Sequence, residues 1–208
     1  MQPILFIFTG PSGVGKGSLM RALLERDPRL SKVVTYTTRP PREGEVEGFD
    51  YHFVSTPTFQ HLVADGTVYE HEKVYQDYYY GSPCELFVDG KDGIIELDYK
   101  GRMKYQLRHR PVVSVFLLPP NLEELRRRIV SRSEVSNLEA RLANAVEQIR
   151  RAHTYDYIVK NVDFETCVAR VQQIVEAERL RRRGTADLAE IEREIADVVL
   201  SPEQAQDE

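Results

Sequence analysis

A glycine-rich turn between an apolar run and a helix-forming segment constrains this chain more than any other feature. The run Ile4–Phe8 is short and rich in β-branched and aromatic residues, so it predicts a buried parallel strand. Ser18–Arg26 carries apolar residues at helical spacing. Gly10, Gly13 and Gly15 therefore lie where a strand becomes a helix, and they let consecutive N–H groups converge beside a positive helix N-terminus. Such a turn favours a polyphosphate ligand.

The turn follows the G-x-x-x-x-G-K-[ST] pattern of phosphate-binding loops from Gly10 to Lys16 and then departs from it. Lys16 would place its charge beside the outer phosphates. Gly17 occupies the position of the usual hydroxyl residue and Ser18 follows it, so either Ser18 binds Mg²⁺ or phosphates and water hold the ion. The alternative is a glycine-rich turn without a ligand, which the flanking strand, helix and lysine disfavour.

Composition is that of a soluble globular protein, with 208 residues, 41% hydrophobic and 29% charged. No apolar run is long enough for a membrane span and no leader pattern is present, so we expect a cytoplasmic protein without a membrane partner. Cys84, Cys167 and the five histidines match no metal or redox spacing.

Charge is distributed unevenly along the chain. The segment from Thr185 to Glu208 holds eight acidic residues and one arginine, a charge of −7. Since the whole chain carries −5, the rest carries about +2. The basic residues of that part are clustered, which suits a polyphosphate ligand at least as well as nucleic acid, and we expect no nucleic-acid partner.

Strand and helix patterns alternate, which predicts an α/β sheet. We expect strands at Lys32–Thr38, Gly48–Val54, Thr67–Glu72, Gly93–Asp98, Val112–Leu118 and Tyr155–Val159. Helices are expected at Thr56–Ala64, at Tyr99–His109, after Asn121, and at Phe164–Arg183, with a further helix at Ala186–Leu200 beyond a break at Gly184.

Two further signals predict helix starts. Thr56 and Pro57 are typical of an N-cap and a first helical position. Ser82–Glu85 has the pattern of a capping box with Pro83 at the first helical position, and so predicts a helix that begins there.

Paired arginines in a proline-stiffened loop form a candidate phosphate site. Arg39 and Arg42 flank Pro40 and Pro41, which hold the backbone extended. Guanidinium groups three residues apart suit bidentate capture of a phosphate. A solvated loop with idle arginines is the alternative.

A second arginine cluster lies near the middle of the chain. Arg128 and Arg132 share one helix face, and Arg141 can face them if the next helix folds back. Phosphoryl transfer needs such positive charge, and a closing helical hairpin would also exclude water. The alternative is a solvated face on which Glu123 and Glu124 pair with some of the arginines.

The sequence resembles the guanylate kinase family from about Ile4 to Arg183. The motifs are GPSGVGKGSL, TYTTRPPREGEVEGFDYHF, YYYGSP, IIELDYKG, LPPNLEELRRRIVSR and YDYIVKN. The resemblance implies a P-loop NTPase-type parallel sheet flanked by helices, a small mixed or antiparallel GMP-binding insert and a helical, arginine-bearing lid. It assigns 1–34, 81–125 and 145–208 to the core, 35–80 to the insert, 126–144 to the lid, and 184–208 to an acidic C-terminal extension.

The resemblance implies transfer of the γ-phosphoryl group of ATP to GMP, and also to dGMP, with Mg²⁺. ATP would be bound by Gly10, Pro11, Ser12, Gly13, Val14, Gly15, Lys16, Gly17 and Ser18, with Ser18 the candidate metal ligand. GMP would be bound by Thr35, Arg39, Arg42, Tyr51, Glu70, Tyr80, Ser82 and Asp98. The catalytic residues would be Lys16, Arg128, Arg132 and Arg141. Carboxylates are apt acceptors for the N1–H and amino group of guanine, and adenine lacks that donor pair.

Four positions depart from the family pattern: Gly17; Glu96, where an aspartate is usual; one extra residue between Glu70 and Gly81; and a loop about two residues shorter between Arg132 and Arg141. Two other functions remain open. One is a non-catalytic guanylate-kinase-like binding module, and the other is a kinase of another small phosphate acceptor. Oligomeric state is not predicted.

Overall fold

The computed structural model describes residues 2–74, 78–87, 90–108, 111–132 and 138–200. The chain divides into two compact units: one is Gln2–Arg170, and the other begins at Val171. The last helix, α6 (Phe164–Leu200), belongs to both. No helix in the described ranges is long and apolar enough to cross a membrane.

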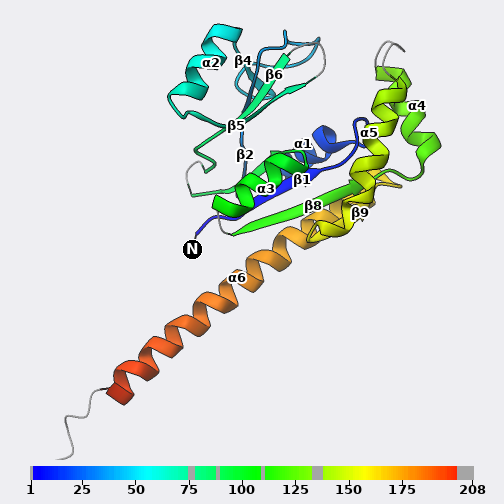
Figure 1. Cartoon of the computed structure of the whole chain (residues 1–208). Helices are drawn as coiled ribbons and strands as arrows, with labels where there is room; N and C mark the ends of the chain where they lie inside the picture. Colours follow the sequence, from blue (N-terminus) through cyan, green and yellow to red (C-terminus); the bar gives the residue numbers. More distant parts are fainter. Residues whose placement is uncertain (1, 75–77, 88–89, 109–110, 133–137, 201–208) are drawn as a thin grey trace, which may run out of the picture. The chain divides into compact units, whose positions relative to one another are not determined.

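A five-stranded parallel sheet lies at the centre of the first unit (Figure 1). Its order is β2-β7-β1-β8-β9, with β1 (Leu5–Thr9) paired on one side to β7 (Asp92–Glu96) and on the other to β8 (Val112–Leu118). The outer strands are β2 (Leu30–Lys32) and β9 (Tyr157–Lys160). All five residues of β1 are buried, as an apolar strand between two neighbours requires.

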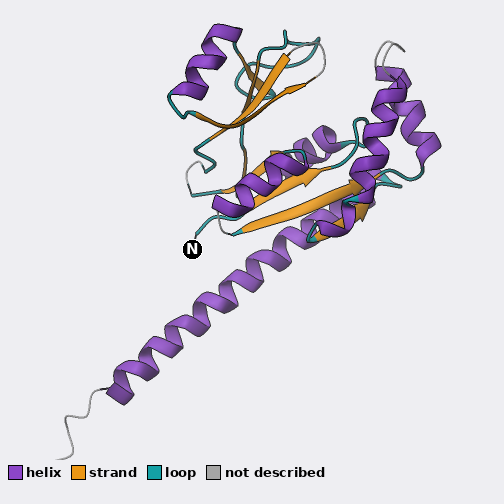
Figure 2. Ribbon diagram, viewed as in Figure 1, coloured by secondary structure: helices purple, strands orange, loops and turns teal. Residues whose placement is uncertain are grey.

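A second, mixed sheet has the order β4-β3-β6-β5, and Figure 2 shows its strands as a separate group. Its strands are β3 (Thr35–Thr37), β4 (Tyr51–Phe53), β5 (Val68–Val74) and β6 (Tyr78–Pro83). β3 and β4 are parallel, whereas β6 runs antiparallel to both β3 and β5. Helix α2 (Thr56–Ala64) packs on β5.

The remaining helices follow the strands of the first sheet. They are α1 (Lys16–Arg26), α3 (Tyr99–Arg108), α4 (Leu122–Arg132), α5 (Leu138–Arg150) and the 3₁₀ turn η2 (Ala152–Thr154). Asn121 caps α4, because its side-chain oxygen accepts from the Glu124 N–H at 2.7 Å. Leu125 and Ile129 of α4 pack against Ala145 of α5, so these two helices fold back on each other.

The α/β class and the parallel sheet are confirmed, and four local predictions are wrong. Lys32–Thr38 is two strands in different sheets, because Lys32 pairs with Ile94 while Thr35 pairs with Tyr51. The antiparallel ladder with β5 takes Ser82 and Pro83 into strand β6, and residues 84–87, which the structure describes, are not helical. The cap of α2 is Ser55, whose hydroxyl accepts from the Thr58 N–H at 3.2 Å, rather than Thr56.

The predicted break at Gly184 is also wrong, because α6 runs through it without interruption. A single glycine inside a helix costs about 1 kcal/mol relative to alanine. The arginines before Gly184 and the alanines, leucines and glutamates after it are strong helix formers, and they outweigh this cost.

Candidate functional site

The glycine-rich turn connects β1 to α1, and the structure explains two of its glycines. A Cβ on Gly10 would lie 2.6 Å from the backbone oxygen of Leu117 in β8. Gly15 has φ of 104° and caps α1 in the left-handed region, and a Cβ there would lie 2.9 Å from Asn161 Nδ2. Both positions therefore favour glycine: Gly10 because of the close backbone oxygen, and Gly15 mainly because of its left-handed conformation.

Lys16 folds back over this turn. Its Nζ donates to the carbonyl oxygens of Gly10 at 2.5 Å and Pro11 at 3.1 Å, and lies 3.3 Å from Glu96 Oε1. Glu96 ends β7 and pairs with Phe8, the last residue but one of β1, so the parallel register brings the acid to the turn. The Glu96 side chain is 48% exposed and Ser18 is exposed in the first turn of α1.

Asn161 contacts this turn from another segment, and the sequence analysis did not single it out. It follows β9 and is buried, and its Nδ2 donates to the Val14 carbonyl oxygen at 2.8 Å. The backbone N–H of Asn161 donates to Leu118 O at 2.8 Å. A polar side chain at the carboxyl end of a predicted strand was the available signal, because the carboxyl ends of parallel strands share one edge of the sheet.

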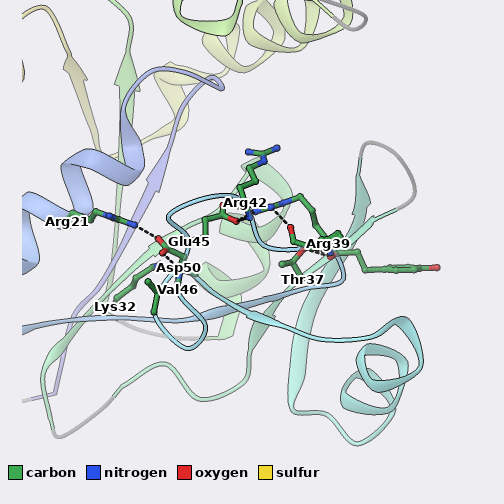
Figure 3. Close-up of polar contacts among 10 residues, drawn as sticks. Arg21, Lys32, Thr37, Arg39, Arg42, Glu45, Val46 and Asp50 are labelled. Atoms are coloured by element: carbon green, nitrogen blue, oxygen red, sulfur yellow. Dashed lines mark hydrogen bonds and ion pairs between the residues drawn. The ribbon is translucent and has the colours of Figure 1, made fainter. Parts of the chain in front are cut away.

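Arg39 is buried in the arginine loop and is held by Glu45 (Figure 3). Its Nη2 donates to both oxygens of Glu45 at 2.7 and 2.9 Å, and its Nη1 donates to Pro40 O at 2.6 Å. Among the described residues, its buried Nε has no hydrogen-bond partner. Glu45 also accepts from the backbone N–H of Arg42 at 2.7 Å, whereas Arg42 itself is exposed.

Aromatic rings surround the Arg39 guanidinium. The guanidinium carbon lies 5.6 Å from the Tyr51 ring centre and 5.8 Å from that of Phe53. Tyr51 and Tyr80 meet edge to face, with ring centres 6.0 Å apart. Burial raises the pKa of the Tyr51 hydroxyl, so it remains a hydrogen-bond donor at neutral pH.

The arginine loop is tied to α1, the helix that follows the glycine-rich turn. Arg21 of α1 donates to Asp50 at 2.7 Å, and Asp50 accepts from the Val46 N–H at 2.9 Å (Figure 3). Lys32 of β2 donates to the carbonyl oxygens of Phe49 and Asp50. These contacts connect the two candidate phosphate sites through residues that the sequence analysis did not single out as site residues.

The predicted purine acids lie close together. A Cβ added to Gly101 of α3 would lie 3.3 Å from Asp98 Oδ1 and 3.4 Å from Glu70 Oε2, so Gly101 separates the two carboxylates. Asp98 accepts from the Gly101 N–H at 2.8 Å, and Glu70 of β5 pairs with Ser82 of β6. Thr35 lies in β3 of the same sheet, partly buried.

Burial and like charge perturb these acids. The pKa of Glu70 is raised by burial and by Asp98 and Glu72, and Lys104, 3.8 Å away, opposes this. Partial desolvation and the neighbouring Glu72 raise the pKa of Asp98. Lys104 and Gly101 of α3 are thus members of this cluster that the sequence reasoning missed.

The arginine hairpin is partly described. Arg128 lies on α4 against the turn, because a Cβ on Gly13 would lie 3.5 Å from the Arg128 Cβ. Glu124 accepts from Arg128 Nε at 2.7 Å and from Arg127, and these bonds lower the Glu124 pKa to about 2. The ion pairs between Glu124 and the arginines of α4, which the sequence analysis gave as the alternative to an anionic ligand, therefore form. Arg141 lies on α5, and the side chain of Arg132 is outside the described residues.

Comparison with known proteins decides the family. A family model described as guanylate kinase matches residues 2–178. The chain belongs to the guanylate kinase family. It is 40% identical over 192 residues to the guanylate kinase of Paramagnetospirillum magneticum, covering 89% of each chain, and 40% identical to that of Thermus thermophilus, covering 94% of this chain and 92% of the relative.

A solved structure agrees with this assignment. The crystal structure of guanylate kinase from Anaplasma phagocytophilum matches with a TM-score of 0.69 and 34% identity, covering 85% of this chain and 86% of that one. The P-loop NTPase-type fold expected for the guanylate kinase family is therefore confirmed. Of the four departures, Gly17 and Glu96 lie at the turn, and the other two fall near 75–77 and 133–137, outside the described residues.

Proposed function

We propose that this chain transfers the γ-phosphoryl group of ATP to GMP and to dGMP, giving ADP and the corresponding diphosphate. Membership of the guanylate kinase family supports the reaction, and one observation carries its assignment to these residues. Glu70 and Asp98 converge beside Gly101, in the same unit as Lys16 and Arg39. The proposed division into core, insert 35–80 and lid 126–144 follows from this assignment.

The acid cluster selects the acceptor base. The N1–H and amino group of guanine donate to Glu70 and Asp98, while Thr35 and Ser82 supply neighbouring hydroxyls. Adenine would leave the buried Glu70 without the guanine donors, and that loss discriminates strongly between substrates.

The arginine loop binds the GMP phosphate. The Arg39 Nε is buried without a partner among the described residues, and a phosphate oxygen would satisfy it. Arg42 adds an exposed guanidinium, and the Tyr51 and Tyr80 hydroxyls add donors. A phosphate held by these groups is fixed in orientation, which favours in-line attack on the other nucleotide.

The turn Gly10–Ser18 binds ATP, and Lys16 with Arg128, Arg132 and Arg141 stabilises the charge of the moving phosphoryl group. Within the described ranges, no group of three or more His, Cys, Asp or Glu side chains could hold a metal ion. The oxygen donors present, the exposed Ser18 hydroxyl and the half-exposed Glu96 carboxylate, suit Mg²⁺ that keeps most of its ligands as water and phosphate. When bound, Mg²⁺ neutralises phosphate charge.

A coupled assay of ADP formation with ATP and Mg²⁺ tests this function. GMP and dGMP are expected to be turned over, with AMP and UMP slower by at least about a hundredfold in kcat/KM. Equal turnover of AMP and GMP would overturn the assignment of the guanine site. If no acceptor led to ADP formation, the enzyme function would be wrong and a non-catalytic binding module would be favoured. A cytoplasmic location is part of the same proposal.

A further inference from the structure

An apolar stripe lies on α6 from Leu180 onward, beyond the part of the chain that the family model matches. Its members are Leu180, Leu188, Ile191 and Ile195, whose exposed fractions are 64%, 58%, 51% and 56%. Scattered exposed apolar residues are ordinary, but four large ones in sixteen residues of one helix need an explanation.

These side chains share one helix face. At about 100° per residue, the stripe and Gly184 between its members fall within an arc of about 80°. The steps from Gly184 onward are four, three and four residues, the spacing of a helix–helix seam. Because isolated helices are marginally stable in water, a long helix with such a face is stabilised by covering it.

The charges beside the stripe change sign along the helix. On one flank Arg183 is followed by Asp187, Glu190 and Glu194. On the other flank Arg181, which pairs with Glu178 in its own helix, is followed by Glu192. Each flank is therefore basic at its beginning and acidic at its end.

This arrangement favours one orientation of a partner helix with the same sequence. In an antiparallel pair, each flank lies beside the corresponding flank of the second copy, which runs in the opposite direction. The basic beginning of one flank then meets the acidic end of the other, so Arg183 would meet Glu190 and Glu194 of the second copy. In a parallel pair, opposite flanks would meet at the same level, and Arg183 would face Arg181 while Glu192 would face Glu190 and Glu194. Like charges at these positions oppose the parallel pair.

We propose that the apolar stripe of α6 pairs in antiparallel orientation with the stripe of a second copy of this chain, centred near Leu188. Leu180 of one copy then packs near Ile195 of the other, and the small Gly184 lets the helices approach near Ile191. The seam is about 23 Å long at about 1.5 Å per residue, which suits a reversible dimer. The pairing does not depend on the proposed catalytic function.

Sedimentation equilibrium of the full chain tests the pairing. The wild type is expected to reach the mass of two chains as concentration rises, and Ile191→Glu is expected to weaken association by at least about a hundredfold, since it puts a charge into the seam. The control is Ala186→Glu, which places the same charge on the opposite, exposed face and should leave the dimer unchanged. Far-ultraviolet circular dichroism of both variants checks that α6 remains helical.

Charge variants test the orientation. Arg183→Glu alone, and Glu190→Arg with Glu194→Arg, should each weaken the antiparallel dimer about tenfold or more, and an equimolar mixture of the two variants should restore it. A parallel pair predicts the reverse for Arg183→Glu, because the introduced carboxylate would then face Arg181. A wild type that stays single at all concentrations, a dimer insensitive to Ile191→Glu, or a dimer tightened by Arg183→Glu would each overturn the proposal.

Discussion

Arg39 donates through Nη2 to both carboxylate oxygens of Glu45, at 2.7 and 2.9 Å, and the two side chains are 8% and 19% exposed. Glu45 also accepts from the backbone N–H of Arg42. One carboxylate therefore fixes both arginine positions of the loop before any ligand arrives. Such prior ordering reduces the entropy lost when a phosphate binds.

Removing the Glu45 carboxylate should impair GMP capture. In Glu45→Ala the largely buried Arg39 loses its ion-pair partner, and we expect the free energy of unfolding to fall by about 3 kcal/mol. The KM for GMP should rise about tenfold or more while kcat changes less. Glu45→Gln keeps the shape of the side chain, so its free energy of unfolding and its KM for GMP should lie between those of the wild type and Glu45→Ala. An unchanged KM for GMP in both variants would show that Glu45 does not position Arg39 for the phosphate.

Lys16→Ala should lower kcat by at least about a hundredfold, the cost typical of removing one donor that stabilises transition-state charge. The fold should be retained, but the melting temperature should fall somewhat, because the Lys16 side chain is only 10% exposed and its Nζ donates to two loop carbonyls. Lys91→Ala, at an exposed lysine, is the matched control. Steady-state rates with saturating ATP and GMP measure the effect; wild-type turnover in Lys16→Ala would contradict the role of the loop lysine.

Gly101→Ala should separate stability from substrate binding. Alanine inside α3 raises helix stability by up to about 1 kcal/mol. The added Cβ, however, would press on Asp98 and Glu70 at 3.3 and 3.4 Å, so we expect the KM for GMP to rise several-fold. Gly184→Ala is the control, since it lies outside the proposed nucleotide sites and nothing within the same chain lies within 4 Å of its Cβ position. If the two variants had the same KM for GMP, Gly101 would not lie at the site that binds the base.

The raised pKa of Glu70 predicts a pH-dependent cost to folding. Because burial makes the folded state bind this proton more tightly than the unfolded state, the free energy of unfolding decreases as pH rises above the ordinary carboxyl value of 4.5. Glu70→Gln removes this loss. The variant should be more stable than wild type at pH 7, and the difference should vanish toward pH 4.

Urea unfolding between pH 4 and pH 7 measures this difference. Asp98 and Glu72 also raise the pKa of Glu70, whereas Lys104 lowers it. Lys104→Met should therefore raise the pKa of Glu70 further and enlarge the loss of stability between pH 4 and pH 7. The same Glu70→Gln protein should show a KM for GMP raised about tenfold or more. A stability difference independent of pH would show that Glu70 titrates normally.

The sequence by itself determined the glycine-rich turn between β1 and α1, the parallel sheet and the family, because these depend on short runs of residues. A buried strand, a glycine pattern and a capping residue such as Asn121 each act through neighbours in the chain. The candidate arginines and acids could be named in the same way, and their roles remain predictions.

Only the tertiary structure decided the split of Lys32–Thr38 between two sheets, the placement of Ser82 in a strand, and the contacts of Arg39 with Glu45 and of Asn161 with Val14. Each depends on partners that local patterns do not specify: a sheet edge, a ladder, or a carbonyl 147 residues away. The physical reason is that strand pairing and burial of polar groups are satisfied across the fold, and they override local signals wherever the two conflict.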